Sequence, residues 1–427
     1  MIPGPHRLYN SHMQKIPKII LLIEGDRGFG RELLSGIAKY SRLHGSWSFY
    51  REPPFFRDLG RKKKILHRIK NWGTDGIITR LVAEIEDIVA TGVPTIVAAS
   101  TNEGTPPGIL NSPTITTDNV AVGEMAAEHL IERGFTSFAY CGFEEIQWSV
   151  QRGESFAKKV AQAGHEANIY MRSKSRALRS WDAEQALVAD WLRSLPKPVG
   201  LMTCTDDRSQ QVVEACKLVG LHVPEDVAII GVDNDRLVCN LSNPPLSSVA
   251  LAAERSGYEA AELLDKLISG EEMAKQRIVI PPTHVVARQS TDILAIEDSE
   301  VAAAVGFIRK HTKETIQVQD VVDAVALSRR GLEKRFRRVL GRSVLAEIRR
   351  VRVEQVARML VETNLPVSQI ALALGFDGVD HIARYFRREK GLSPLKYRKE
   401  YGQKSVSYTH LRAHETSLQL VCRLLLE

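Results

Sequence analysis

Residues 336–343 read FRRVLGRS, and residues 386–393 read FRREKGLS. Both copies fit the pattern F-R-R-x-x-G-x-S, and they lie fifty residues apart. In each copy the pattern follows a short helical segment, a turn and a second helical segment with a polar start. An internal repeat of this kind predicts that one structural unit occurs twice, and the periodicity identifies the unit as a helix-turn-helix.

The first unit reads as a supporting helix, a turn and a second helix. We expect the supporting helix over residues 318–325 and the turn at residues 326–327. Ser328 suits the N-cap of the second helix, because its side-chain oxygen can accept a bond from an unpaired backbone N–H. Leu332 and Phe336 are four residues apart, so they share one helix face and are expected in the core.

The second unit repeats this organisation. A helix over residues 367–374 is followed by Gly375, and glycine suits a tight helix ending. The second helix of this unit is expected over about residues 379–390. Ile382 and Phe386 have the same four-residue spacing as the apolar pair of the first unit, so they are expected in the core as well.

The faces opposite these apolar pairs are mostly polar and charged. The first unit presents Arg329, Arg330, Glu333, Lys334 and Arg337 there, and the second presents Val379, Asp380, His381, Arg384 and Arg388. An α-helix fits the major groove of DNA, where arginine and lysine can bond to guanine edges. A joining helix over residues 343–363 would span roughly 30 Å, close to one DNA turn, so both second helices could enter successive major grooves. For His381 two readings stay open, a contact with a base and a bystander.

The charge of the chain is unevenly divided. Residues 301–404 contain 22 Lys and Arg and 11 Asp and Glu, a net charge of +11, whereas the first 300 residues contain 34 and 38, a net charge of −4. Arginines along a single helix are more often a solvated face than a binding surface. Because the apolar positions repeat and the charge is concentrated, the pattern favours a nucleic-acid-binding module attached to a different domain.

The first 290 residues alternate short apolar runs with helical patterns, which is typical of a parallel α/β sheet. We expect strands over residues 19–23, 76–79, 94–98, 138–142, 200–204 and 227–232, and helices over residues 31–40, 121–133 and 152–163. These elements are too many for a single doubly wound sheet. The pattern therefore favours two similar lobes with a cleft between them. A linker at 291–299 leads to the helical region at 300–401. Residues 405–427 have an unrelated composition and are either a disordered tail or an error in the sequence.

Residues 300–401 resemble the AraC-type DNA-binding domain. The closing pattern G-x-S-P-x-x-Y-R is present as Gly391, Ser393, Pro394, Tyr397 and Arg398, and the element I-A-x-x-x-G-F as Ile370, Ala371, Gly375 and Phe376. These motifs are specific and cover about a quarter of the chain. One departure is Ala326, where the family often has glycine in the first turn. The resemblance implies a transcription factor whose partner is double-stranded promoter or operator DNA.

Residues 16–290 resemble the sugar-sensing core of LacI-type repressors, which has the periplasmic-binding-protein fold. The matching elements are Thr117-Asp118-Asn119, Arg152-x-x-Ser155-Phe156, Cys204-Thr205-Asp206 and Ile230-Gly231-Val232-Asp233-Asn234. LacI-type repressors carry their helix-turn-helix before this core, and the 15 residues before Ile16 are too few for one. A chain in which the sugar-sensing domain comes first and the AraC-type DNA-binding domain comes last is similar in domain order to regulators of xylose operons. It implies a small sugar effector, xylose or a related pentose being favoured over another carbohydrate or small molecule. We expect a homodimer, because symmetric oligomers predominate among such proteins and paired sites raise affinity, and RNA polymerase as a further partner.

Sugar hydroxyls donate and accept hydrogen bonds, so carboxylates and arginine can fix them while an aromatic face packs on the ring. Carried over by position, the resemblance implies Arg152, Asp206 and Asp233 as the main ligand-binding residues, with Arg208, Asp118, Phe29 and Trp148 as further ones. Open α/β sheets bind ligands at strand ends and helix starts. Plainer readings stay open: Asp118 as an N-cap, Asp206 as the N-cap of a helix from Gln210, and Trp148 as a core residue.

Other classes of function would leave different marks. The sequence has no G-x-x-x-x-G-K-[ST], H-E-x-x-H or G-x-S-x-G, and residues 25–30 (GDRGFG) lack the G-x-G-x-x-G spacing, which argues against an enzyme. The five cysteines are scattered without a CxxC pair, so we expect no disulfide framework, metal site or cofactor. No segment reads as a signal peptide or a membrane span, so a cytoplasmic protein is expected rather than a transport receptor.

Overall fold

The computed structural model describes residues 16–51, 61–80, 85–98, 112–172, 181–271, 276–296, 298–312, 314–376 and 378–402. The segment at 405–427 lies outside these residues. The chain divides into two compact units. The first unit comprises the residues up to 130 together with 136–292, and the second comprises residues 131–135 together with those from 293 onward. A short segment inside the α/β part of the sequence thus belongs to the helical unit.

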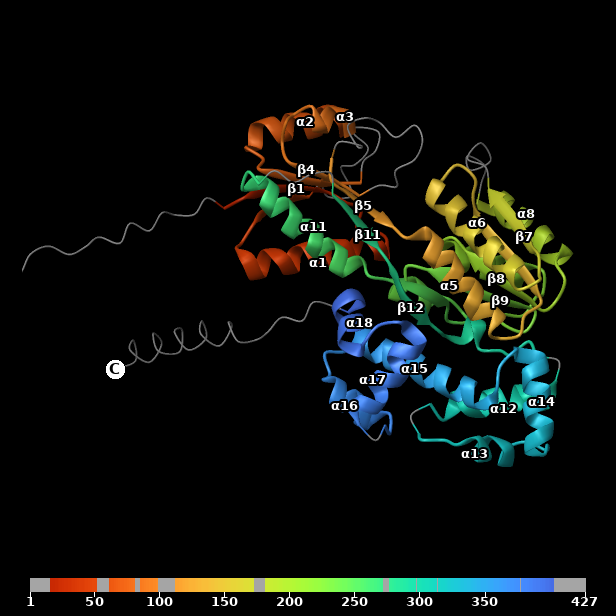
Figure 1. The fold of residues 1–427 in the computed structure, drawn as a ribbon. Helices are drawn as coiled ribbons and strands as arrows, with labels where there is room; N and C mark the ends of the chain where they lie inside the picture. Colours follow the sequence, from red (N-terminus) through yellow and green to blue (C-terminus); the bar gives the residue numbers. More distant parts are fainter. Residues whose placement is uncertain are drawn as a thin grey trace, which may run out of the picture. The chain divides into compact units, whose positions relative to one another are not determined.

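The first unit contains two sheets, one in each of two lobes (Figure 1). In the first lobe the strands lie in the order β11-β5-β4-β3-β1-β2, and neighbouring strands are parallel. They are β1 (Lys18–Leu22), β2 (Ser48–Arg51), β3 (Gly76–Thr79), β4 (Thr95–Val97), β5 (Thr114–Thr117) and β11 (Arg277–Ile280). The helices are α1 (Gly28–His44), α2 (Arg61–Trp72), α3 (Ile85–Val89) and α11 (Ala253–Ile268).

The sheet of the first lobe is covered on both faces. Ile65 and Ile69 of α2 and Ile88 of α3 pack with Ile20 and Ile77 of the sheet. Helices α1 and α11 pack against each other on the opposite face (Figure 1). Strands buried from both sides explain why β1 and β3 are continuous apolar runs in the sequence.

The second lobe repeats this design with the strand order β12-β10-β9-β8-β6-β7. Its strands are β6 (Ser137–Phe143), β7 (Ala167–Arg172), β8 (Val199–Thr203), β9 (Val227–Val232), β10 (Ser247–Leu251) and β12 (Pro282–Val286), of which only β12 runs antiparallel to its neighbour. Its helices are α5 (Asn119–Ile131), α6 (Gln147–Gln162), α8 (Trp181–Ser194), α9 (Asp206–Leu218) and α10 (Arg236–Leu241).

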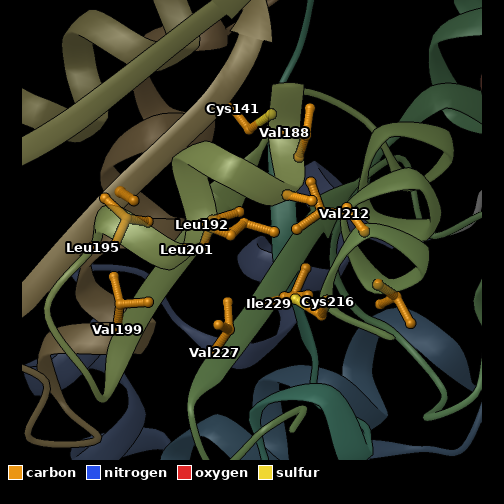
Figure 2. Close-up of a cluster of buried hydrophobic side chains, with 14 of the residues drawn as sticks. Cys141, Val188, Leu192, Leu195, Val199, Leu201, Val212, Cys216, Val227 and Ile229 are labelled. Atoms are coloured by element: carbon orange, nitrogen blue, oxygen red, sulfur yellow. The ribbon is translucent and has the colours of Figure 1, made fainter. Parts of the chain in front are cut away.

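One core of the second lobe lies between its sheet and helices α8 and α9 (Figure 2). Leu192 of α8 and Val212 of α9 pack there with Leu201 of β8 and Ile229 of β9. Cys141 and Cys216 are buried in the same cluster, which agrees with thiols that act as small apolar side chains.

The chain passes between the lobes three times: from β5 to α5, from β10 to α11, and from β11 to β12. The predicted two-lobed α/β fold is confirmed. Because the strands of each sheet are almost all parallel, their carboxyl ends gather at one edge, and the loops that follow them are brought together.

The second unit is helical. It contains α12 (Ser299–Lys310), α13 (Val318–Asp323), α14 (Arg329–Leu340), α15 (Val344–Glu362), α16 (Val367–Ala373), α17 (Val379–Lys390) and α18 (Pro394–Tyr401). The apolar pairs are buried as predicted, each in a separate core, Leu332 and Phe336 in the first and Ile382 and Phe386 in the second. Within the part of the chain that the structure describes, no helix is both long enough and apolar enough to cross a membrane.

Local capping explains the boundaries of these helices. The side chain of Ser328 accepts a bond from the N–H of Gly331 at 3.3 Å, so the predicted N-cap is confirmed. Gly375 has a φ of +63°, a left-handed conformation that costs glycine little, and it closes the turn after α16. Helix α15 of 19 residues is roughly 28 Å long, as the joining helix was expected to be.

Candidate functional site

The first lobe brings an aromatic and a charged side chain to the carboxyl ends of its strands. Arg80 directly follows β3, and Phe29 lies in the first turn of α1, the helix after β1. The guanidinium carbon of Arg80 lies 4.8 Å from the centre of the Phe29 ring, and both residues are half-buried. Burial lowers the pKa of Arg80, while the nearby carboxylates of Glu24 and Asp233 oppose that change.

The second lobe presents a matching pair on α6. The guanidinium carbon of Arg152 lies 5.0 Å from the centre of the Trp148 ring. The Nε of Arg152 donates to Oδ1 of Asn119 at 3.1 Å, and its Nη1 donates to the carbonyl oxygen of Cys204 at 2.5 Å. With only 4% of the residue exposed, these bonds hold the guanidinium in one orientation before any ligand arrives.

Asp233 follows β9 and lies within electrostatic reach of both lobes. Its φ is +100° and that of Asn234 is +51°, a left-handed region that aspartate and asparagine enter more readily than other residues with a side chain. Burial raises the pKa of Asp233, and the charges of Arg152 and Arg80 oppose that rise. An arginine from each lobe therefore acts on this carboxyl group.

Asp206 lies in the first turn of α9 and is only 2% exposed. Its Oδ2 accepts from the backbone N–H of Asp235 at 2.7 Å. Burial, and next the charge of Asp233, raises the pKa of Asp206 well above its usual range. The reading of Asp206 as an N-cap for a helix from Gln210 is wrong, because α9 begins at Asp206 and its N-cap is Thr205.

The two lobes touch each other beside these residues. Asp235, at the start of α10, accepts from the backbone N–H of Gly28 at 2.8 Å and from Nη2 of Arg31 at 2.6 Å. A second ion pair, Arg27 to Asp207, has a distance of 3.6 Å. Gly28 has no room for a side chain, since a Cβ there would lie 2.8 Å from the Cβ of Asp235.

Two predicted ligand residues already have partners within the protein. The buried Nη2 of Arg208 pairs with Oε1 of Glu184 at 2.8 Å, and its guanidinium carbon lies 5.4 Å from the Phe143 ring centre, so it is an internal ion pair of the second lobe. Oδ1 of Asp118 accepts from the N–H of Ala121 at 3.0 Å, which is the capping role that we left open.

Sequence reasoning missed Arg80, Arg31, Asp235 and Asn119. Arg80 could have been found, because it follows a buried strand at its carboxyl end, as Asp233 does. The partners of the other three were not readable, because Arg31 and Asp235 are 204 positions apart and Asn119 and Arg152 are 33 positions apart.

The assembled residues fit a small, neutral, hydroxyl-rich ligand. Two carboxyl groups can accept hydrogen bonds, two arginines can donate them, and two aromatic rings can cover an apolar ring face. No cluster of histidine, cysteine, aspartate and glutamate among the described residues could hold a metal ion.

In the second unit, α14 and α17 carry the charged faces predicted for DNA. Arg329, Arg330, Lys334 and Arg337 of α14 are exposed, and so are Val379, Asp380, Arg384 and Arg388 of α17, whereas Glu333 and His381 are half-buried. Both helices end at a left-handed glycine, Gly341 with φ of +67° and Gly391 with φ of +71°. The two helices thus present comparable exposed faces, and α15 joins the two helix-turn-helix motifs to which they belong.

Two family models match the chain. Residues 127–291 match a periplasmic binding protein-like domain, and residues 321–400 match a helix-turn-helix domain. Apart from residues 131–135, the first match lies in the two-lobed unit, and the second match lies in the helical unit.

Individual relatives match nearly the whole chain. The xylose operon regulatory protein of Escherichia coli strain K12 is 33% identical over 390 residues, which is 89% of this chain and 96% of the relative. That of Haemophilus influenzae is 29% identical over 387 residues, 89% of this chain and 98% of the relative. A solved structure of a xylose-binding transcription activator is 32% identical in sequence. The match covers 91% of this chain and 100% of the solved chain, with a TM-score of 0.57. The chain belongs to the family of the xylose operon regulatory proteins, AraC-type helix-turn-helix transcriptional regulators, not enzymes, that carry a periplasmic-binding-protein-like domain.

Proposed function

We propose that this regulator senses xylose or a related pentose between the lobes of its first unit and reads a specific promoter sequence with its second. The observation that carries the sugar site is the setting of Asp233, with an arginine–aromatic pair from each lobe nearby. The choice of xylose is supported by the relatives from E. coli and H. influenzae, which are xylose operon regulatory proteins. A different carbohydrate or small molecule is the alternative.

The proposed roles within the ligand site follow from chemistry. Asp233 and Asp206 accept bonds from sugar hydroxyls, and Arg152 and Arg80 donate to ring or hydroxyl oxygens. Phe29 and Trp148 offer their faces to the apolar side of the ring. Asp118 is a weaker candidate because it already caps α5, and Arg208 has no ligand role in this proposal.

The proposed DNA contacts lie on α14 and α17. The exposed arginines and Lys334 bond to guanine edges or phosphates, and Glu333, Val379 and Asp380 complete the two faces. We infer that residues 16–290 form the effector domain, 291–299 the linker and 300–401 the DNA-binding domain. The protein acts in the cytoplasm as a homodimer, since paired sites raise affinity, and contacts RNA polymerase at the promoter.

Regulation needs a ligand that distinguishes two conformations. A sugar held by both lobes favours the state in which both reach it, and it can shift the DNA-binding equilibrium only by its difference in affinity for the two states. By linkage, DNA must then change the affinity for the sugar by the same factor.

A thermal-shift screen of the full chain against pentoses, hexoses and their phosphates tests the sugar site. A ligand at 100 times its Kd stabilises by about 2.7 kcal/mol. We expect a shift confined to xylose or a close pentose, and its loss in Asp233→Asn. Asp190→Asn is the matched control, because the side chain of Asp190 is 70% exposed on α8. A panel without any shift, or a shift that Asp233→Asn retains, would contradict this site.

A further inference from the structure

Helix α17 rests on α15 through a column of aromatic and arginine side chains. The guanidinium carbon of Arg352 lies 4.1 Å from the ring centre of Phe376. The rings of Phe376 and His381 contact each other edge to face, with their centres 6.2 Å apart. The rings of His381 and Tyr385 do the same, with their centres 4.7 Å apart. Arg349 then closes the column, 5.2 Å from the centre of the Tyr385 ring.

The column spans three parts of the second helix-turn-helix. Arg349 and Arg352 are one turn apart on α15, Phe376 lies in the turn, and His381 and Tyr385 lie in the first two turns of α17. Contacts of edge-to-face rings and of a guanidinium with a ring are each modestly favourable. Together they link the start of α17 to the joining helix.

Arg352 also fixes the turn itself. Its Nη2 donates to the carbonyl oxygens of Leu374 at 2.7 Å and Gly375 at 3.3 Å, the two residues that directly follow α16. The hydroxyl of Thr315 donates to the same Gly375 oxygen at 2.5 Å. The backbone that leads into α17 is therefore held from two sides.

The first helix-turn-helix solves the same problem differently. The repeat aligns Ser328, the N-cap of α14, with Gly378, the N-cap of α17 that has no side-chain bond. It aligns His381 with Gly331 and Tyr385 with Arg335, so α14 has no counterpart of these rings. Where the first unit uses a capping serine, the second uses the column.

We propose that His381 is a positioning residue: between Phe376 and Tyr385, it sets the direction in which α17 presents Arg384 and Arg388 to DNA. The half-buried His381 acts through its two ring neighbours and does not read a base. This inference rests on DNA binding by the second unit and extends it to the way in which one recognition helix is aimed.

Two variants at one position separate the two roles. His381→Phe keeps an aromatic ring in the column but removes every hydrogen-bonding atom, whereas His381→Ala removes the ring. Leu372→Ala is the matched control, because Leu372 is 81% exposed on the neighbouring helix α16. All variants are made in the full chain.

The first readout needs no DNA. Amide hydrogen exchange of residues 382–386, whose N–H groups donate to the carbonyl oxygens at the start of α17, should be roughly 5-fold faster in His381→Ala, because the first turn of α17 loses its lateral support, and unchanged in His381→Phe and Leu372→Ala. Equal exchange in wild type and His381→Ala would overturn the proposal, whatever the protein binds.

The second readout is selection from a random 30-base-pair duplex library. We expect His381→Phe to enrich the wild-type sequence with a Kd within about 2-fold, and His381→Ala to lose about 10-fold in affinity. The lost preference should be confined to the half-site that Arg384→Ala also affects. A changed base preference in His381→Phe would show that the imidazole reads a base and would overturn the proposal. A wild-type chain that enriches no sequence would instead contradict DNA reading, while the exchange measurement still decides the column.

Discussion

Replacing Glu347 by glutamine should destabilise the second unit and leave the first unchanged. Glu347 is fully buried on α15. It accepts from Nε of Arg342 at 2.5 Å and from Nε and Nη2 of Arg350 at 2.9 and 2.8 Å. Arg350 in turn donates from Nη1 to Glu132, in the segment 131–135 of the same unit, at 2.5 Å. Glu347→Gln removes the charge that neutralises both arginines.

The magnitude follows from burial. Removing one partner of a buried ion pair costs about 3–5 kcal/mol, because the remaining charge stays desolvated. Here the side chains of Arg342 and Arg350 keep 25% and 19% exposure, and Arg350 keeps Glu132, so a smaller loss of about 2–3 kcal/mol is expected. Glu132→Gln is the matched control, since its side chain is 28% exposed and the loss should be below about 1 kcal/mol.

The distribution of tryptophan provides the assay. All five tryptophans lie before residue 192, in the first unit, so their fluorescence reports that unit while far-UV circular dichroism reports both. Urea unfolding should show an earlier dichroism transition in Glu347→Gln and an unchanged fluorescence transition. The Arg350 and Arg342 contacts lower the pKa of Glu347 despite its burial, so its contribution is present at neutral pH and is lost as pH falls through that lowered pKa. A loss under 0.5 kcal/mol at pH 7, or one confined to fluorescence, would refute this reasoning.

Three further predictions concern the two units. Burial, and next the charge of Glu254, raises the pKa of Glu32 to about 7. The folded state therefore binds the proton more tightly, and the first unit should lose up to about 3 kcal/mol as pH rises from about 4.5 to 7. Glu32→Gln should reduce this slope in tryptophan-monitored unfolding, leaving the part that comes from Asp206 and Asp233, and an unchanged slope would exclude Glu32 as a source. Gly28→Ala should weaken sugar binding about 10-fold by calorimetry, because a Cβ collides with Asp235 across the lobes; the exposed Ser35→Ala is its control, and equal affinities would contradict a close approach in the bound state. Arg384→Ala should cost about 1–3 kcal/mol on the selected duplex if it reads a base, whereas an equal loss on all sequences with a flatter salt dependence would identify a phosphate contact.

Several helices of the second unit could be read from the sequence because they carry their own boundary signals, whereas α12 and α18 were not predicted as separate helices. The range predicted for the second recognition helix, residues 379–390, coincides with α17, since an apolar pair and a terminal glycine mark it. Strands β3 and β9 were also predicted at their observed bounds, because both are fully buried apolar runs. Strands such as β7 were missed because an edge strand needs no continuous apolar pattern.

The candidate site was only partly readable, for a physical reason. Arg152 and Asp233 sit beside motifs, but whether an arginine faces a ligand or an internal carboxylate depends on partners distant in the sequence. Arg208 pairs with Glu184 of α8, and nothing local distinguishes it from Arg152. The contact of Gly28 and Arg31 with Asp235 likewise exists only once the two lobes are folded together.

The central claim is that a sugar bound to the first unit changes DNA binding by the second. Fluorescence anisotropy of the full chain on its selected duplex, with and without saturating D-xylose, tests it most directly. The account predicts that the sugar changes the Kd for DNA by about 5- to 150-fold, the usual range of allosteric coupling, and that Asp233→Asn removes the change while leaving the sugar-free affinity intact. A Kd for DNA that is the same without sugar, with xylose and with every other sugar of the panel would contradict the claim.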